Sequence, residues 1–177
     1  MSIKPNEAFE ELQNQGVEFF SGVPDSLLKN FCAFVDDNVD KENHVITANE
    51  GSSIALSIGY HLATSKVPLV YMQNSGLGNA INPLLSLADE KVYSVPMILM
   101  IGWRGEPGVK DEPQHIKQGA VTQDMLNAMH IETFILDQNS SLEILRQAYN
   151  AAKNHNKPVA VLIKKNTFSE YKSMEKL

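Results

Sequence analysis

The sequence predicts a doubly wound α/β fold, in which a mainly parallel six-stranded sheet carries helices on both faces. Short runs rich in β-branched and aromatic residues alternate along the chain with segments of helical periodicity. A run such as residues 95–101 (VPMILMI) is apolar at nearly every position, which is typical of a strand covered on both sides. Strict alternation of strands and helices favours parallel strands joined by right-handed crossovers.

Six strands and six helices are predicted in turn. The strands are residues 17–20 (VEFF), 44–47 (HVIT), 67–72 (VPLVYM), 95–101 (VPMILMI), 132–136 (ETFIL) and 158–163 (PVAVLI). The helices are residues 6–15, 26–38, 51–64, 79–88, 122–129 and 141–154. Several of the helices begin at an Asp, Ser or Thr that can cap a helix N-terminus.

Length and composition indicate one domain, residues 1–177. A chain of 177 residues with 43% hydrophobic content can bury one good core but not two. A net charge of -6 without a cluster of Lys and Arg argues against nucleic acid or an anionic membrane as the main partner. No signal region or membrane-length apolar run is present, so we expect a cytoplasmic protein. Cys32 is the only cysteine and is predicted to be an inert core thiol.

Four polar segments follow the predicted strands, at the edge of the sheet where doubly wound proteins bind ligands. They are SGVPDS, ANEGSS, QNSGLGN and the stretch 102–119 (GWRGEPGVKDEPQHIKQG). The last is rich in Gly and Pro and lacks periodicity, so it is predicted to be a long functional or mobile loop.

Each motif taken alone also allows a purely structural interpretation. Glu50 can be a solvated first-turn glutamate that the helix dipole favours. QNSGLGNAINP has two glycines at a strand-to-helix turn, but it lacks the full GxGxxG and GK[ST] patterns. The chain has no HExxH, no cysteine pair and no GxSxG, which argues against a metal site made by this chain alone or a nucleophile elbow.

Together, four segments resemble the thiamine-diphosphate-dependent decarboxylases, in particular those that act on phosphonopyruvate or sulfopyruvate. The segments are GVPDSLL, ANEGSSIALSIGYHLAT, PLVYMQNSGLGNAINPLLSLAD and MIGWRGEPGVKDEPQHIKQG. The resemblance is highly specific over residues 22–119 and continues more loosely through PVAVLIKKNTFSEYK. It implies the thiamine-diphosphate-binding fold and identifies residues 1–177 as the pyrimidine-binding, N-terminal domain.

The resemblance also implies a partner. Active sites in this family form between a pyrimidine-binding domain and a pyrophosphate-binding domain, whose GDG motif holds magnesium and diphosphate. No GDG occurs in this sequence. We therefore expect thiamine diphosphate as cofactor, Mg²⁺ held by a pyrophosphate-binding domain or β subunit, no metal ligand on this chain, and a homo- or hetero-oligomer. The chain is either a separate α subunit or the N-terminal piece of a longer polypeptide.

The implied reaction is decarboxylation of a 2-oxoacid, with phosphonopyruvate giving phosphonoacetaldehyde and CO2 as the preferred reaction and sulfopyruvate as the alternative substrate. A non-catalytic α/β binding module is a second class of function, supported by the missing diphosphate motif. A stand-alone hydrolase or dehydrogenase is disfavoured, because neither a nucleophile elbow nor a complete dinucleotide fingerprint is present.

By the same resemblance, Glu50 corresponds to the glutamate that hydrogen-bonds the cofactor's aminopyrimidine ring and favours its imino tautomer. Sharing a proton in this way needs a dry setting, which the apolar residues around Glu50 are expected to supply. Asp25, as a catalytic residue, and Ser26, as a substrate ligand, would face the reacting centre. The residues expected to line the cofactor are Glu50, Gln73, Asn74, Gly76, Gly78 and Asn79.

The stretch after the fourth strand supplies the remaining candidates. His115, with Gln114 beside it, resembles the histidine-bearing segment of related decarboxylases and would donate a proton at the reacting centre. A phosphonate needs charge compensation, for which Arg104, Lys110 and Lys117 are the cations available in this stretch.

Overall fold

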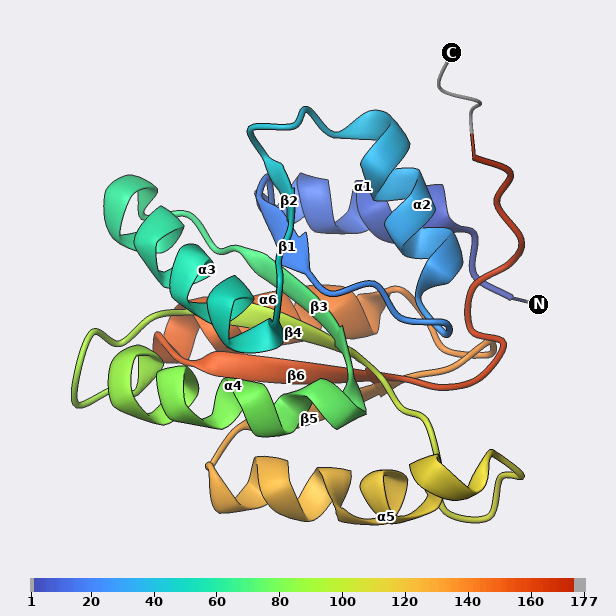
Figure 1. Cartoon of the computed structure of the whole chain (residues 1–177). Coiled ribbons are helices and arrows are strands. Elements are labelled where there is room, and N and C mark those ends of the chain that lie inside the picture. The colour runs from blue at the N-terminus through green and yellow to red at the C-terminus, as the bar shows by residue number, and fades with distance from the viewer. Residues whose placement is uncertain (1, 174–177) are drawn as a thin grey trace.

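The computed structural model describes residues 2–173, which form a six-stranded sheet between two layers of helices (Figure 1). The strand order is β2-β1-β3-β4-β6-β5, and every neighbouring pair is parallel. The predicted doubly wound α/β class is therefore confirmed. The strands are β1 (Phe20–Gly22), β2 (His44–Ile46), β3 (Leu69–Gln73), β4 (Met97–Gly102), β5 (Glu132–Leu136) and β6 (Pro158–Ile163).

Three helices cover each face of the sheet. One face carries α1 (Pro5–Gln15), α2 (Lys29–Asn38) and α6 (Glu143–His155), and the other carries α3 (Glu50–Thr64), α4 (Leu77–Pro83) and α5 (Pro113–Ala128). A 3₁₀ turn, η1 (Asn74–Gly76), leads into α4, and a π-helical turn, η2 (Leu84–Ala88), extends it. No helix within residues 2–173 is long and apolar enough to cross a membrane.

The alternation of side chains along the central strands divides the core in two. In β3, Leu69 and Tyr71 pack with the α1, α2 and α6 layer, whereas Val70 and Met72 pack with the α3, α4 and α5 layer. This is the expected consequence of burying both faces of a parallel strand. Cys32 is buried in the first of these two clusters, as predicted.

The first strand lies later in the chain than predicted, at residues 20–22 instead of 17–20. The reason is the end of α1, where Gly16 adopts a left-handed conformation with φ of 100°. The Val17 N–H then bonds the Leu12 carbonyl oxygen at 3.1 Å, so it completes the helix end and is not available for the sheet.

The predicted long loop at residues 102–119 is too long, because α5 already begins at Pro113. A proline fits the first turn of a helix, where its missing N–H would have no partner. Gly119 lies inside this helix, and a Cβ at this position would lie 1.8 Å from the Gly105 carbonyl oxygen. The glycine is needed for close packing of α5 on the loop, which offsets its poor helix propensity.

Small polar side chains hold the start of α3 against the sheet. The Asn49 side chain caps the helix by accepting the Ser52 N–H at 3.0 Å. Below it, the Ser21 hydroxyl of β1 donates to the Ser53 carbonyl oxygen at 3.3 Å and lies 3.0 Å from the Ser57 hydroxyl. These buried contacts fix the distance between α3 and β1, and they thereby fix the position of Glu50.

Gly22 of β1 offers a test of this close packing. A Cβ at Gly22 would lie 2.1 Å from the Tyr71 carbonyl oxygen on β3, whereas a Cβ at Gly59 on α3 would meet nothing within 4 Å. We expect Gly22→Ala to lower the free energy of unfolding by about 1–3 kcal/mol through overpacking. Gly59→Ala should raise it by up to about 1 kcal/mol. Urea denaturation of both variants measures the difference, and equal midpoints would contradict the strand spacing.

Candidate active site

The carboxyl ends of β1, β2, β3 and β4 bring most of the predicted site residues to one edge of the sheet. Asp25 follows β1, Glu50 follows β2, and η1 follows β3. Arg104 follows β4. Because parallel strands all end at the same edge, residues that are far apart in sequence meet there.

Glu50 is the first residue of α3, one residue before the predicted start of this helix, and its carboxylate lies on the turn after β3. Its Oε2 accepts a hydrogen bond from the Asn79 side chain at 2.8 Å. A Cβ on Gly76 would lie 2.2 Å from Oε1, so the absence of a side chain there makes room for the carboxylate. Within residues 2–173 no other donor bonds the half-buried Glu50 side chain, which leaves Oε1 able to accept one from a ligand.

The other predicted cofactor ligands differ in their exposure and in whether their side chains already hydrogen-bond within the chain. Gly78 is exposed, and a Cβ there would meet nothing within 4 Å. The Gln73 side chain turns back and donates to the Ser75 hydroxyl at 2.6 Å. Asn74 is buried, and its amide binds within the chain: Nδ2 donates to the Arg104 carbonyl oxygen at 2.8 Å and to the Thr122 hydroxyl at 3.0 Å. The Asn74 side chain therefore positions the turn.

Asp25 is a buried carboxyl group with one unsatisfied oxygen. Its Oδ2 accepts the backbone N–H groups of Leu27 at 2.8 Å and Leu28 at 3.2 Å, and the residue is 5% exposed. Its Oδ1 is buried and has no partner within the described residues. Burial raises the pKa of Asp25, although these backbone donors and the nearby charge of Arg104 oppose the rise. The protonated form is therefore favoured more than in an exposed aspartate.

Arg104 links the turn after β1 to the loop after β4. Its Nη1 donates to the Ser26 hydroxyl at 2.8 Å. Its Nε and Nη2 donate to the two oxygens of Asp111, at 2.8 and 2.5 Å. The guanidinium group holds the pKa of Asp111 well below its usual range. Asp111 was not predicted as a site residue, because no sequence pattern marks it as the partner of Arg104.

The remaining predicted residues lie on or beside the first turns of α5. His115 is half-buried, whereas Gln114, Lys117 and Lys110 are exposed. The His115 backbone N–H donates to the Glu112 carbonyl oxygen at 2.9 Å. Within residues 2–173, no hydrogen bond or ion pair engages these four side chains, so the structure does not join them to Asp25 or Glu50.

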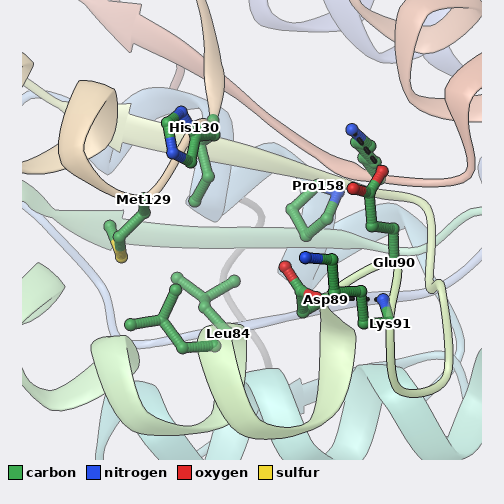
Figure 2. Close-up of a pocket in the computed structure, with 10 residues that line it drawn as sticks. Leu84, Asp89, Glu90, Lys91, Met129, His130 and Pro158 are labelled. Carbon is green, nitrogen blue, oxygen red and sulfur yellow. Dashed lines mark hydrogen bonds and ion pairs between the residues drawn. The ribbon is translucent and has the colours of Figure 1, made fainter.

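A cavity of about 480 Å³ opens at the opposite edge of the sheet (Figure 2). It is lined by Ile131 and Pro158, at the amino ends of β5 and β6, and by Met129 and His130. Its charged residues Glu90 and Lys157 form an ion pair. The cavity is remote from the strand ends that carry Glu50.

In the described part of the chain, no group of three or more His, Cys, Asp or Glu side chains is arranged to hold a metal ion.

A comparison with known protein families identifies the family to which this chain belongs. Residues 7–131 match the family described as "Thiamine pyrophosphate enzyme, N-terminal TPP binding domain". The chain therefore belongs to the thiamine pyrophosphate enzymes and contains their N-terminal TPP-binding domain. This confirms the resemblance found in the sequence.

Two relatives share this domain with the chain. The sulfopyruvate decarboxylase subunit alpha of Methanococcus maripaludis is 31% identical over 156 residues, which cover 88% of this chain and 90% of that subunit. The phosphonopyruvate decarboxylase of Streptomyces viridochromogenes is 34% identical over 145 residues, which cover 81% of this chain and 36% of that enzyme. The chain thus spans nearly all of one relative and about a third of the other.

The fold also matches solved structures. A benzoylformate decarboxylase from Polynucleobacter necessarius superposes with a TM-score of 0.66 at 19% identity, covering 100% of this chain and 33% of that one. A thiamin diphosphate-dependent enzyme from Mycobacterium smegmatis gives a TM-score of 0.68 at 17% identity. At such low identity, these matches show the fold alone.

The turn below Glu50 yields a matched pair of variants. Gly76→Ala should displace the Glu50 carboxylate and break its hydrogen bond with Asn79, which lowers the free energy of unfolding by about 0.5–1.5 kcal/mol. Gly78→Ala, two residues later and facing open space, should leave the chain as stable or up to about 1 kcal/mol more stable. Thermal and urea unfolding of the two variants can be compared directly. Equal stability of Gly76→Ala and Gly78→Ala would contradict the expected cost of displacing the carboxylate.

Proposed function

We propose that this chain supplies the pyrimidine-binding half of a thiamine-diphosphate-dependent 2-oxoacid decarboxylase, with phosphonopyruvate as preferred substrate and sulfopyruvate as the alternative. The observation that carries the proposal is the Glu50 carboxylate. It stands at the start of a helix, held by Asn79 over Gly76, with one oxygen able to accept a hydrogen bond. A carboxylate held in this way fits the ring nitrogen of an aminopyrimidine.

Thiamine diphosphate would supply the carbon nucleophile and the electron sink for loss of CO2. Glu50 would hold the proton at the pyrimidine ring nitrogen. The exposed Gly78, together with Gln73 and Asn79, would border the ring. Mg²⁺ would be bound by the pyrophosphate-binding partner and not by this chain.

Asp25 and His115 are proposed to donate and accept protons at the reacting carbon. Asp25 is suited to this role because burial favours its protonated form and because Oδ1 has no partner within the described residues. The His115 side chain makes no hydrogen bond within residues 2–173, so it is free to turn toward a substrate. Gln114 and Lys117 would contact the substrate from the same turns of α5.

The exposed face of α3 and α4 is the proposed docking surface for the partner. These helices pack side by side, and Leu56 and Leu62 of α3 and Leu85 of η2, which extends α4, are between 40% and 55% exposed. Glu50 is the first residue of α3, the helix that carries Leu56 and Leu62. The relative named as a subunit alpha supports a separate pyrophosphate-binding subunit, and the longer relative supports one polypeptide that holds both domains. Apolar patches of this kind mark interaction sites.

Replacing Glu50 tests the assignment. In the complete enzyme, Glu50→Gln should lower kcat for phosphonopyruvate about 10²–10⁴-fold, because a group that moves a proton is lost while its shape is kept. Glu18→Gln is the control, since Glu18 is an exposed partner of Lys66 away from the site. Steady-state kinetics with matched cofactor content gives the answer, and activity within a few-fold of wild type would remove Glu50 from this role.

The docking surface can be tested separately. Leu62→Glu should weaken binding to the pyrophosphate-binding polypeptide at least tenfold, because a charge would be buried in an apolar contact. Ile135→Glu, at the β5 edge of the sheet, changes an exposed residue outside that surface and should leave binding unchanged. Sedimentation velocity with purified partner measures both, and equal affinity of Leu62→Glu and wild type would place the contact elsewhere.

A further inference from the structure

The loop after β4 is closed by the single carboxylate of Asp111. Its Oδ2 accepts Nε of Arg104 and the backbone N–H of Gly105, both at 2.8 Å. Its Oδ1 accepts Nη2 of Arg104 at 2.5 Å and the backbone N–H of Glu112 at 2.8 Å. An ionised carboxylate offers about four acceptor sites, so Asp111 is fully satisfied. It joins Gly105, near the start of the loop, and Glu112, the last residue of the loop, to the Arg104 side chain.

This arrangement fixes the direction of Arg104. Asp111 takes the edge of the guanidinium formed by Nε and Nη2, and Ser26 takes one donor on Nη1. The buried Asn74 side chain holds the Arg104 backbone through both its N–H and its carbonyl oxygen. Since a guanidinium has five N–H donors, one on Nη1 and one on Nη2 are left for a ligand.

Arg104 and Asp111 line a cavity of about 230 Å³ at the carboxyl ends of β4 and β6, with Leu27 and Lys165 also in its wall. The charges in this wall are mostly compensated. Arg104 pairs with Asp111, and Glu106 pairs with Lys164 at 2.6 Å. Among the described residues of the wall, Lys165 is the only charged one without an ion pair. The cavity therefore carries one uncompensated positive charge beside a directed guanidinium.

We propose that this cavity is the subsite for the tetrahedral oxyanion group of the substrate, a phosphonate or a sulfonate. Lys165 supplies the charge, Arg104 supplies directed N–H donors, and Asp111 is the positioning residue that aims Arg104. The cavity adjoins the catalytic turn, because Leu27 is two residues from Asp25 and Arg104 bonds Ser26. The inference rests on the proposed function, and it names the residues of the site that would bind the phosphonate or sulfonate group of the substrate.

Binding can be followed without turnover, because Trp103 lines the same cavity and is the only tryptophan of the chain. Titration of the full chain with methylphosphonate or with methanesulfonate should give a saturable change in Trp103 fluorescence. Lys165→Met should abolish this change, and Asp111→Asn should weaken it about tenfold or more, as expected for lost charge-assisted hydrogen bonds. Lys157→Met and Glu90→Gln, which alter the distant ion pair, are the matched controls. No change in the wild type, or an equal change in Lys165→Met, would overturn the proposal.

Kinetics of the complete enzyme then separates this inference from the proposed function. With phosphonopyruvate and sulfopyruvate, Lys165→Met and Asp111→Asn should raise KM about 10–100-fold and change kcat less than about threefold. With pyruvate, which lacks the oxyanion group, kcat/KM should fall much less than with the two anionic acids. A collapsed loop would instead lower kcat for all three acids and would count against the positioning role. A wild-type enzyme that decarboxylates none of them would refute the function, and the fluorescence titration would still decide the subsite.

Discussion

The buried amide of Asn74 joins the parts of the candidate site. It binds the Arg104 backbone through both donor and acceptor, and it reaches Thr122 on α5. Each such hydrogen bond contributes about 1 kcal/mol net, and leaving the buried partners unsatisfied would cost more. The ends of β3 and β4 are therefore held at a fixed separation. The turn that starts at Asn74 places Gly76 under Glu50, while the loop that starts at Arg104 places the guanidinium beside Ser26.

Much of the fold could be predicted because its determinants are local. Strands such as Pro158–Ile163 are apolar on both faces, and Asn49 caps α3 directly before Glu50. The start of α5 could not be predicted, because Gly119 is tolerated only through its packing on Gly105, a contact between distant backbone segments. Asp111 and Lys165 were missed for the same reason. Their roles depend on a loop conformation that includes a positive φ at Gly105, which no periodicity encodes.

The chain by itself leaves Glu50 only half-buried. The dry surroundings expected from the sequence are incomplete, because Ile46 of β2 is 56% exposed and Leu56 of α3 is 40% exposed. A carboxylate beside water is screened, and its coupling to a ring nitrogen is correspondingly weak. Assembly with a second domain would remove this water. The proton shared by Glu50 and the cofactor would thus be controlled by assembly as much as by the residue itself.

The two proposed recognition elements use different parts of the backbone. Glu50 rests on η1 and α4, whereas Asp111 closes a loop between β4 and α5 that makes no contact with the Glu50 carboxylate. Mutations that lengthen, shorten or recharge the loop can therefore accumulate while the activating glutamate stays in place. In evolutionary terms, a lineage can exchange one acid for another through drift in a single surface segment, without passing through an ancestor that has lost its cofactor chemistry.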